Sequence, residues 1–296
     1  MKMPRRLALV LTLFCSAPVA LPVLANNVIT LGGFNVPDGV AVDGSGNVFV
    51  AETGSFYIKE MLAPAYTTTN TLGDGTALNH PAGVAVDATG NVFFSDSSYN
   101  TVKRFLAGSY TASASSPLGS GFILPQGVAV DGGGNVYVGD PSNYAVYEIV
   151  AAGGYTTVRT LVQDVPTLVP YGVAVDGSGN VFFSDYYVGV KEILAVGGVI
   201  PASPTIVTIG SGFHYPRGVA VDGNGNVFVA DSGNSAVKEI LAPDYTKVYT
   251  IGADGGFNLP HGVAVDNNGH VFVADTYNAV VKEILFPDDL FENGFE

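Results

Sequence analysis

One seven-residue motif recurs six times, and it limits what this chain can fold into more than any other feature. The motif reads Pro-x-Gly-Val-Ala-Val-Asp and begins at residues 37, 81, 125, 170, 216 and 260, so successive copies lie 44 to 46 residues apart. A period of this length is typical of folds in which each repeat forms one supersecondary unit that packs against its neighbours. The regularity excludes two unrelated domains.

Each repeat has room for four short strands. In the fifth repeat, the motif and a Gly-rich turn are followed by the apolar segment 226–231, by 236–240 and by 245–251. Val, Phe and Tyr favour strands, whereas Gly, Asp and Asn favour tight turns. The third segment alternates with Lys and Glu, so we expect it to be more exposed than the first two. The repeats predict an all-β, six-bladed β-propeller of four-stranded antiparallel blades.

The two ends of the repeat array indicate how the ring closes. The sixth repeat stops after three strands, at residues 280–285, and the segment 27–32 resembles the strand that it lacks. We predict that this N-terminal strand completes the last blade. Closure of this kind leaves no inner edge strand unpaired.

The motif and the Val-Phe-Val-Ala-Asp segment that follows it resemble the NHL repeat, across nearly all of residues 26–287. The resemblance implies an NHL-repeat β-propeller of the exported bacterial type. It implies little about function, because one fold hosts many functions.

Both termini fall outside the repeats. Residues 1–25 combine a basic start, an apolar run and Val-Leu-Ala at the end, which is the pattern of a cleaved signal peptide. We therefore expect a secreted or periplasmic protein with no membrane span after cleavage, an uncleaved anchor being the alternative. Residues 288–296 form an acidic tail, for which a sorting role and a disordered end are both open.

Removing the signal peptide makes the chain more acidic. The whole chain carries 12 basic and 26 acidic side chains, and the loss of Lys2, Arg5 and Arg6 leaves nine basic ones, a formal charge of −17. Such a body repels phosphate backbones, so nucleic acid is excluded as a partner. The only cysteine, Cys15, leaves with the signal, and we expect a monomer with no cofactor and no disulfide.

The acidic residues that recur in every repeat are interpreted as structural. The Asp that ends each motif is expected to cap the following turn, and the acidic residue that ends each second strand to bond local backbone. The variable positions are better functional candidates. Those on the loops that share one rim of the ring are Asp38, Gln126, Tyr144, Tyr171, Tyr186, Tyr187, Arg217, His261 and Tyr277.

Two functions fit this rim. We favour a non-enzymatic propeller whose rim binds a peptide, glycan or protein, because loops on a rigid scaffold carry function and Tyr gives contact area at low entropic cost. The alternative is a metal-assisted lyase or hydrolase. Pro260-His261 matches a Pro-His motif of the peptide-amidating lyase, a propeller similar to NHL proteins. His80 and His214 would then complete a three-histidine site with His261.

Overall fold

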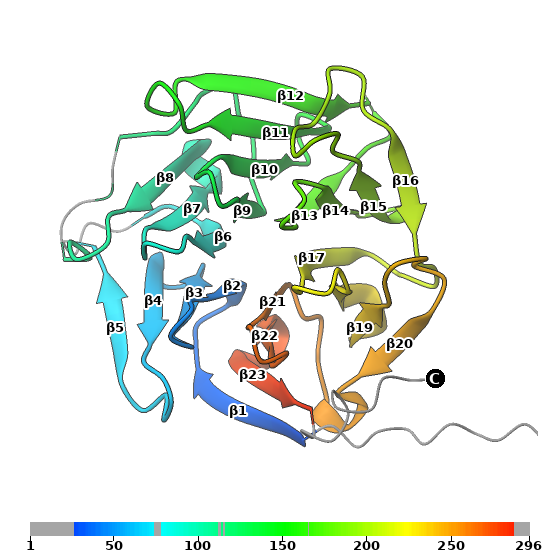
Figure 1. Cartoon of the computed structure of the whole chain (residues 1–296). Coiled ribbons are helices and arrows are strands. Elements are labelled where there is room, and N and C mark those ends of the chain that lie inside the picture. The colour runs from blue at the N-terminus through cyan, green and yellow to red at the C-terminus, as the bar shows by residue number, and fades with distance from the viewer. Residues whose placement is uncertain (1–26, 74–77, 112–113, 115, 165, 287–296) are drawn as a thin grey trace, which may run out of the picture.

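Six antiparallel sheets stand around a central channel in the computed structural model, which describes residues 27–286 except 74–77, 112–113, 115 and 165 (Figure 1). The predicted six-bladed propeller is confirmed. The proposed signal peptide and the acidic tail lie outside the described residues. Among the described residues, the helices are single 3-10 turns, and none could span a membrane.

In each of the first three blades the strands follow one another in chain order from the channel outward (Figure 1). Blade 1 comprises β2 (Pro37–Val42), β3 (Val48–Glu52), β4 (Tyr57–Met61) and β5 (Thr69–Leu72). Blade 2 comprises β6 (Pro81–Val86), β7 (Val92–Asp96) and β8 (Thr101–Phe105). Blade 3 comprises β9 (Val128–Val130), β10 (Val136–Asp140), β11 (Ala145–Val150) and β12 (Thr157–Gln163).

The remaining blades follow the same order. Blade 4 comprises β13 (Pro170–Val175), β14 (Val181–Asp185), β15 (Gly189–Ile193) and β16 (Ile206–Ile209). Blade 5 comprises β17 (Pro216–Val221), β18 (Val227–Asp231), β19 (Ala236–Ile240) and β20 (Val248–Ile251). Blade 6 comprises β21 (Gly262–Val265), β22 (Val271–Asp275), β23 (Val280–Leu285) and, as its outer strand, β1 (Asn27–Gly33).

The ring is closed by pairing between the first and last described strands, as predicted. Strand β1 runs antiparallel to β23, from the pair Asn27–Leu285 to the pair Gly33–Val280. In Figure 1 the blue first strand lies beside the red last one. Opening the ring would therefore separate strands more than 240 residues apart in sequence.

Blade 2 departs from the expected four strands. Among the described residues its fourth position holds only an isolated bridge between Val102 and Leu118. The sequence from 107 to 117 is rich in Ala, Ser and Gly and ends in Pro117, which cannot donate a ladder hydrogen bond. The alternation that marks the outer strand of other blades is missing here.

The cores lie between blades. Phe49 of blade 1 packs in one cluster with Phe94 of blade 2, and Phe228 of blade 5 with Val271 of blade 6. The side chains of Phe49 and Phe94 are fully buried. This explains why the second strands read as unbroken apolar runs, because each is covered on both faces.

The third strands are less exposed than their alternation suggested. Glu60, Glu148, Glu192 and Glu283 are all buried. Three of them have a polar partner: Asn70 donates to Glu60 at 3.0 Å, Arg159 pairs with Glu148 at 2.5 Å, and His270 lies 3.2 Å from Glu283. The third strands are more exposed than the wholly buried second strands, as expected, but not more exposed than the first strands, because polar side chains cover these carboxylates.

The Asp after each first strand caps a turn, as interpreted from sequence. Asp43 accepts hydrogen bonds from the backbone N–H groups of Ser45 and Asn47, both at 2.8 Å. Asn47 in turn accepts from the backbone N–H of Ala63. The arrangement recurs around the ring, so these turns hold the two inner strands of each blade at one end of the channel.

Candidate functional site

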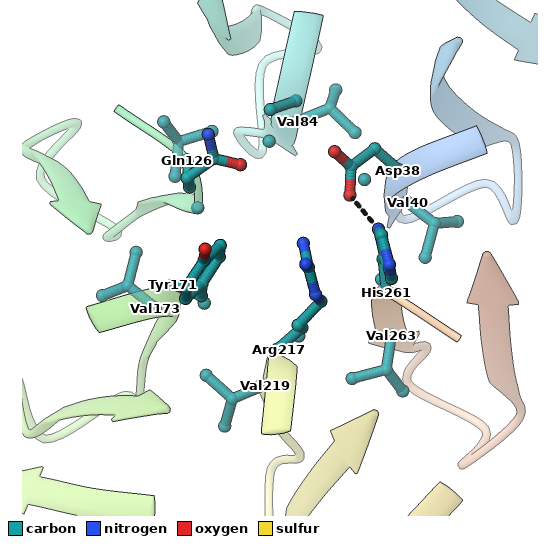
Figure 2. A pocket seen from close by; sticks show the side chains of 18 residues that line it. Asp38, Val40, Val84, Gln126, Tyr171, Val173, Arg217, Val219, His261 and Val263 are labelled. Carbon is teal, nitrogen blue, oxygen red and sulfur yellow. Dashed lines mark hydrogen bonds and ion pairs between the residues drawn. The ribbon is translucent and has the colours of Figure 1, made fainter. Parts of the chain in front are cut away.

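The x residues of the six motifs surround one end of the channel. The cavity there has a volume of about 70 Å³. Its polar lining comes from Asp38, Gln126, Tyr171, Arg217 and His261, and Ala82 fills the sixth position. We call these six residues the mouth (Figure 2). A cavity of this size suits a small group rather than a large ligand.

The glycines of the motif bring the mouth residues close together. A Cβ on Gly172 would lie 2.2 Å from the carbonyl oxygen of Arg217 in the next blade, and one on Gly262 would lie 2.5 Å from that of Asp38. Such an approach is open only to glycine. The backbone of each blade therefore contacts that of the next around the channel, and the x side chains gather in a small space.

Buried carboxylates at the ends of the second strands hold the loops that lead into the mouth. Asp231 accepts from the backbone N–H of His214 at 2.7 Å and pairs with Lys238 at 2.7 Å. Asp275 likewise accepts from the backbone N–H of Asn258 at 2.7 Å. The interpretation that these residues bond local backbone is confirmed. They position the mouth without lining it.

Asp38 and His261 form a pair that joins the first and last blades. Nδ1 of His261 lies 3.0 Å from an oxygen of Asp38, and the two side chains are 14% and 18% exposed. Burial alone would raise the pKa of Asp38, but the hydrogen bond with His261 and the charges of His261, Arg217 and His80 outweigh it. The pKa of Asp38 therefore lies below its ordinary value of 3.8.

Arg217 points into the channel between Tyr171 and His261 (Figure 2). Its guanidinium carbon lies 4.7 Å from the ring centroid of Tyr171 and 5.7 Å from that of Tyr186. Burial raises the pKa of Tyr171, and the Arg217 charge opposes that rise. Cation–π stacking fixes the guanidinium while leaving its N–H groups directed at the channel.

The other predicted residues lie at different distances from the mouth. The ring centroid of Tyr186 lies 5.0 Å from that of Tyr171 in the mouth, and the centroid of Tyr187 lies 5.2 Å from that of Tyr186. The exposed ring of Tyr277 lies 6.2 Å from the His261 ring. Tyr144 is half-buried and does not line the cavity.

Tyr215 belongs to the same rim, but our sequence interpretation did not include it. Its ring stacks on that of Tyr186, with the centroids 4.7 Å apart, and makes a tilted contact with the His214 ring at 4.1 Å. It occupies the position before the motif Pro, where the other repeats carry Val36, His80, Leu124, Val169 and Leu259. An aromatic ring at this one variable position was the available signal.

The histidines do not assemble into a metal centre. Across the described part of the chain, no group of three or more His, Cys, Asp and Glu side chains could hold a metal ion. His261 pairs with Asp38, and the ring of His214 contacts that of Tyr215. A catalytic zinc needs three protein ligands, and His80, His214 and His261 do not form such a set.

Comparisons with known proteins agree with the fold. A family model for the NHL repeat matches residues 213–240 and 257–282. No curated protein matches the sequence.

Solved structures resemble the chain closely in fold and weakly in sequence. A gluconolactonase from Xanthomonas campestris matches with 14% identity and a TM-score of 0.71, covering 88% of this chain and 90% of that one. A virginiamycin B lyase from Staphylococcus aureus matches with 10% identity and a TM-score of 0.62, covering 88% and 99%. A chain of a nidogen/laminin complex matches with 20% identity and a TM-score of 0.63, covering 81% and 85%. At these identities the likeness shows the fold alone.

Proposed function

Because this chain is an NHL-repeat β-propeller, whose neighbours in fold include a lactonase and a lyase, we propose that its mouth is the active site of a hydrolase or lyase. The substrate is a small molecule with an ester or lactone group. The observation that carries the proposal is the Asp38–His261 pair beside the inward-pointing Arg217. The fold likeness makes such chemistry plausible for the scaffold, and the residues supply the groups.

The pair provides a general base. When the neutral ring carries its proton on Nδ1, His261 donates a hydrogen bond from Nδ1–H to Asp38. The Nε2 lone pair is then free to accept a proton from water or from a substrate C–H group. The low pKa of Asp38 keeps it ionised at neutral pH. Asp38 then stabilises the imidazolium that forms when His261 takes the proton.

Arg217 provides the complementary charge. When water attacks an ester carbonyl, or a C–H proton leaves beside it, negative charge grows on the carbonyl oxygen. A guanidinium held by Tyr171 can donate hydrogen bonds to that oxygen without reorganising. No step requires a metal ion, in keeping with the donor groups at this site.

Turnover of a panel of aryl esters and of five- and six-membered lactones tests the proposal. We expect His261→Gln to lower kcat/KM by about 10²- to 10⁴-fold, and Arg217→Gln by about 10²- to 10³-fold. Tyr99→Ala is the control, because Tyr99 is an exposed residue on a blade 2 loop outside the mouth, and it should change kcat/KM less than about threefold. No turnover by the wild type, or equal turnover by all variants, would refute catalysis.

A non-catalytic binding propeller is the second candidate. It is favoured by the exposed tyrosines beside the mouth, of which Tyr187 is 70% exposed. A peptide, glycan or protein held at that rim requires no reaction. Saturable, Arg217-dependent binding of a ligand that is recovered unchanged would support this function over the first.

Export of the chain is part of the same proposal. The signal-peptide pattern of residues 1–25 supports a secreted or periplasmic location. Fractionation of cells that make the full chain tests it. We expect the wild-type chain to be found outside the cytoplasm in shortened form. When Lys2, Arg5 and Arg6 are replaced by neutral residues, we expect the full-length protein inside the cytoplasm.

A further inference from the structure

Four tyrosines form a continuous surface beside the mouth, on blades 4 and 5. We call Tyr171, Tyr186, Tyr187 and Tyr215 the tyrosine platform. Tyr186 is its centre, with ring centroids 5.0 Å from Tyr171, 5.2 Å from Tyr187 and 4.7 Å from Tyr215. The Tyr186 and Tyr215 rings are stacked with an interplanar angle of 21°.

The platform is not part of the core of the propeller. None of its four residues belongs to the hydrophobic clusters found between blades among the described residues. Tyr187 is 70% exposed and Tyr215 39% exposed. Aromatic rings that contact one another on the surface, and add nothing to the core, are more typical of a binding surface than of packing.

The platform leads directly to Arg217, the arginine of the cavity lining. Arg217 packs against Tyr171 and Tyr186, so its guanidinium lies at the inner end of the row of rings. On blades 2 and 3 the mouth carries Ala82 and Gln126 instead. An elongated ligand with its charged end in the mouth would therefore extend over blades 4 and 5, and not over blades 2 and 3.

The charges at the mouth limit the ligand to a single negative group. The chain carries a formal charge of −14, and ionised Asp38 shares the cavity with Arg217. One guanidinium matches one carboxylate in charge and in its two-pronged geometry. A phosphate ester carries more negative charge and would be repelled by Asp38 and by the acidic body.

The platform indicates what is attached to that carboxylate. The C–H faces of pyranose rings are apolar and carry partial positive charge, so they stack on the negative faces of aromatic rings, while tyrosine hydroxyls can bond sugar hydroxyls. We propose that the site binds an acidic saccharide, with a terminal uronate carboxylate on Arg217 and the adjoining pyranose ring on Tyr187 and Tyr215. Hydrolysis of an ester or lactone at the uronate carbonyl leaves a carboxylate in the same place, so Arg217 faces the carbonyl before the reaction and the uronate after it. This inference names the substrate class of the proposed active site and therefore rests on that function.

Calorimetric titration with three matched probes tests the inference. They are a trisaccharide that ends in glucuronate, the same trisaccharide ending in glucose, and free glucuronate. We expect the glucuronate-ended trisaccharide to bind about tenfold or more tightly than either of the others, because only it engages both Arg217 and the platform.

Variants separate the two parts of the site. Tyr187→Ala combined with Tyr215→Ala should weaken binding of the acidic trisaccharide about tenfold and leave free glucuronate unchanged. Arg217→Gln should weaken both. Tyr99→Ala is the control, because Tyr99 is 55% exposed on a corresponding loop of blade 2 and lies away from the platform. Circular dichroism would confirm that each variant is folded.

The outcomes distinguish this inference from the proposed function. If free glucuronate binds as tightly as the trisaccharide, or the platform variant binds normally, the inference is overturned while the mouth remains a carboxylate site. If esters and lactones are turned over but no probe binds, the acidic saccharide is overturned and the catalytic proposal stands. If no ester or lactone is turned over and no probe binds, both fail.

Discussion

The two ends of the channel use the same backbone in opposite ways. At one end, each first strand runs into a turn whose sequence hardly changes between blades, such as Asp43 to Asn47, and whose Asp caps the turn. At the other end, the x residue of each motif occupies an equivalent place, yet the six side chains differ in charge, size and aromaticity. Repetition thus marks the residues that build the blade, and variation marks those free to bind a ligand.

The largest effect should come from a repeated residue that supports the mouth without lining it. Asp231 has a fully buried side chain that pairs with Lys238, itself 13% exposed, and accepts the N–H of His214. Asp231→Ala leaves that lysine without its carboxylate and should lower the free energy of unfolding by about 3 to 5 kcal/mol. Chemical denaturation measures this, and a loss below about 1 kcal/mol would show that the carboxylate is dispensable for the fold.

A smaller loss is expected where the blades approach each other. Gly172→Ala places a Cβ 2.2 Å from the carbonyl oxygen of Arg217, so the ring must expand there, at a cost of about 3 kcal/mol. Gly177→Ala is its control in the same blade, because a Cβ at that turn meets nothing within 4 Å. Equal stability of the two variants would contradict the close contact between blades.

The stability of the fold should depend on pH through Glu239, which lies in β19 near Asp222 of the turn after β17. Burial, and next the charge of Asp222, raise the pKa of Glu239 from 4.5 to about 7. Between those values the folded state binds more protons than the unfolded one, so stability falls as pH rises from 4.5 to 7.

Glu239→Gln removes this dependence. The variant should be more stable than wild type at pH 8, where wild-type Glu239 is ionised, and equal to it at pH 4. Thermal unfolding at both pH values measures the difference. A variant with the same advantage at pH 4 as at pH 8 would show that the gain has another cause than the carboxylate's charge.

The sequence predicted the fold far better than the site. The motif spacing predicted six blades, and the incomplete sixth repeat predicted the closing strand. Both predictions were possible because the residues that build a blade recur in every repeat. In blade 2 the described residues form three strands and an isolated bridge, and the one sequence signal of this difference was a composition rich in Ser and Ala.

At the mouth, the sequence predicted that the variable positions share a rim. It did not predict which of these side chains are in contact. The contact between Asp38 and His261, residues 223 positions apart, depends on how the ring closes. The stacking of Tyr215 on Tyr186 depends in the same way on the angle between neighbouring blades. The spacing of residues within a repeat contains no information on either contact.

A comparison of Asp38→Ala with Asp43→Ala tests the central claim most directly. Asp38 lies near the start of β2 and Asp43 directly after its last residue, so the two aspartates stand at opposite ends of the channel. For the ester or lactone with the highest wild-type kcat/KM, we predict that Asp38→Ala lowers kcat/KM by about 10²-fold or more, because His261 loses its partner. Asp43→Ala should lower the free energy of unfolding by about 2 kcal/mol, through the hydrogen bonds lost at its turn, and leave kcat/KM unchanged. Loss of activity in both variants, or in Asp43→Ala alone, would contradict the division between a structural end and a functional end.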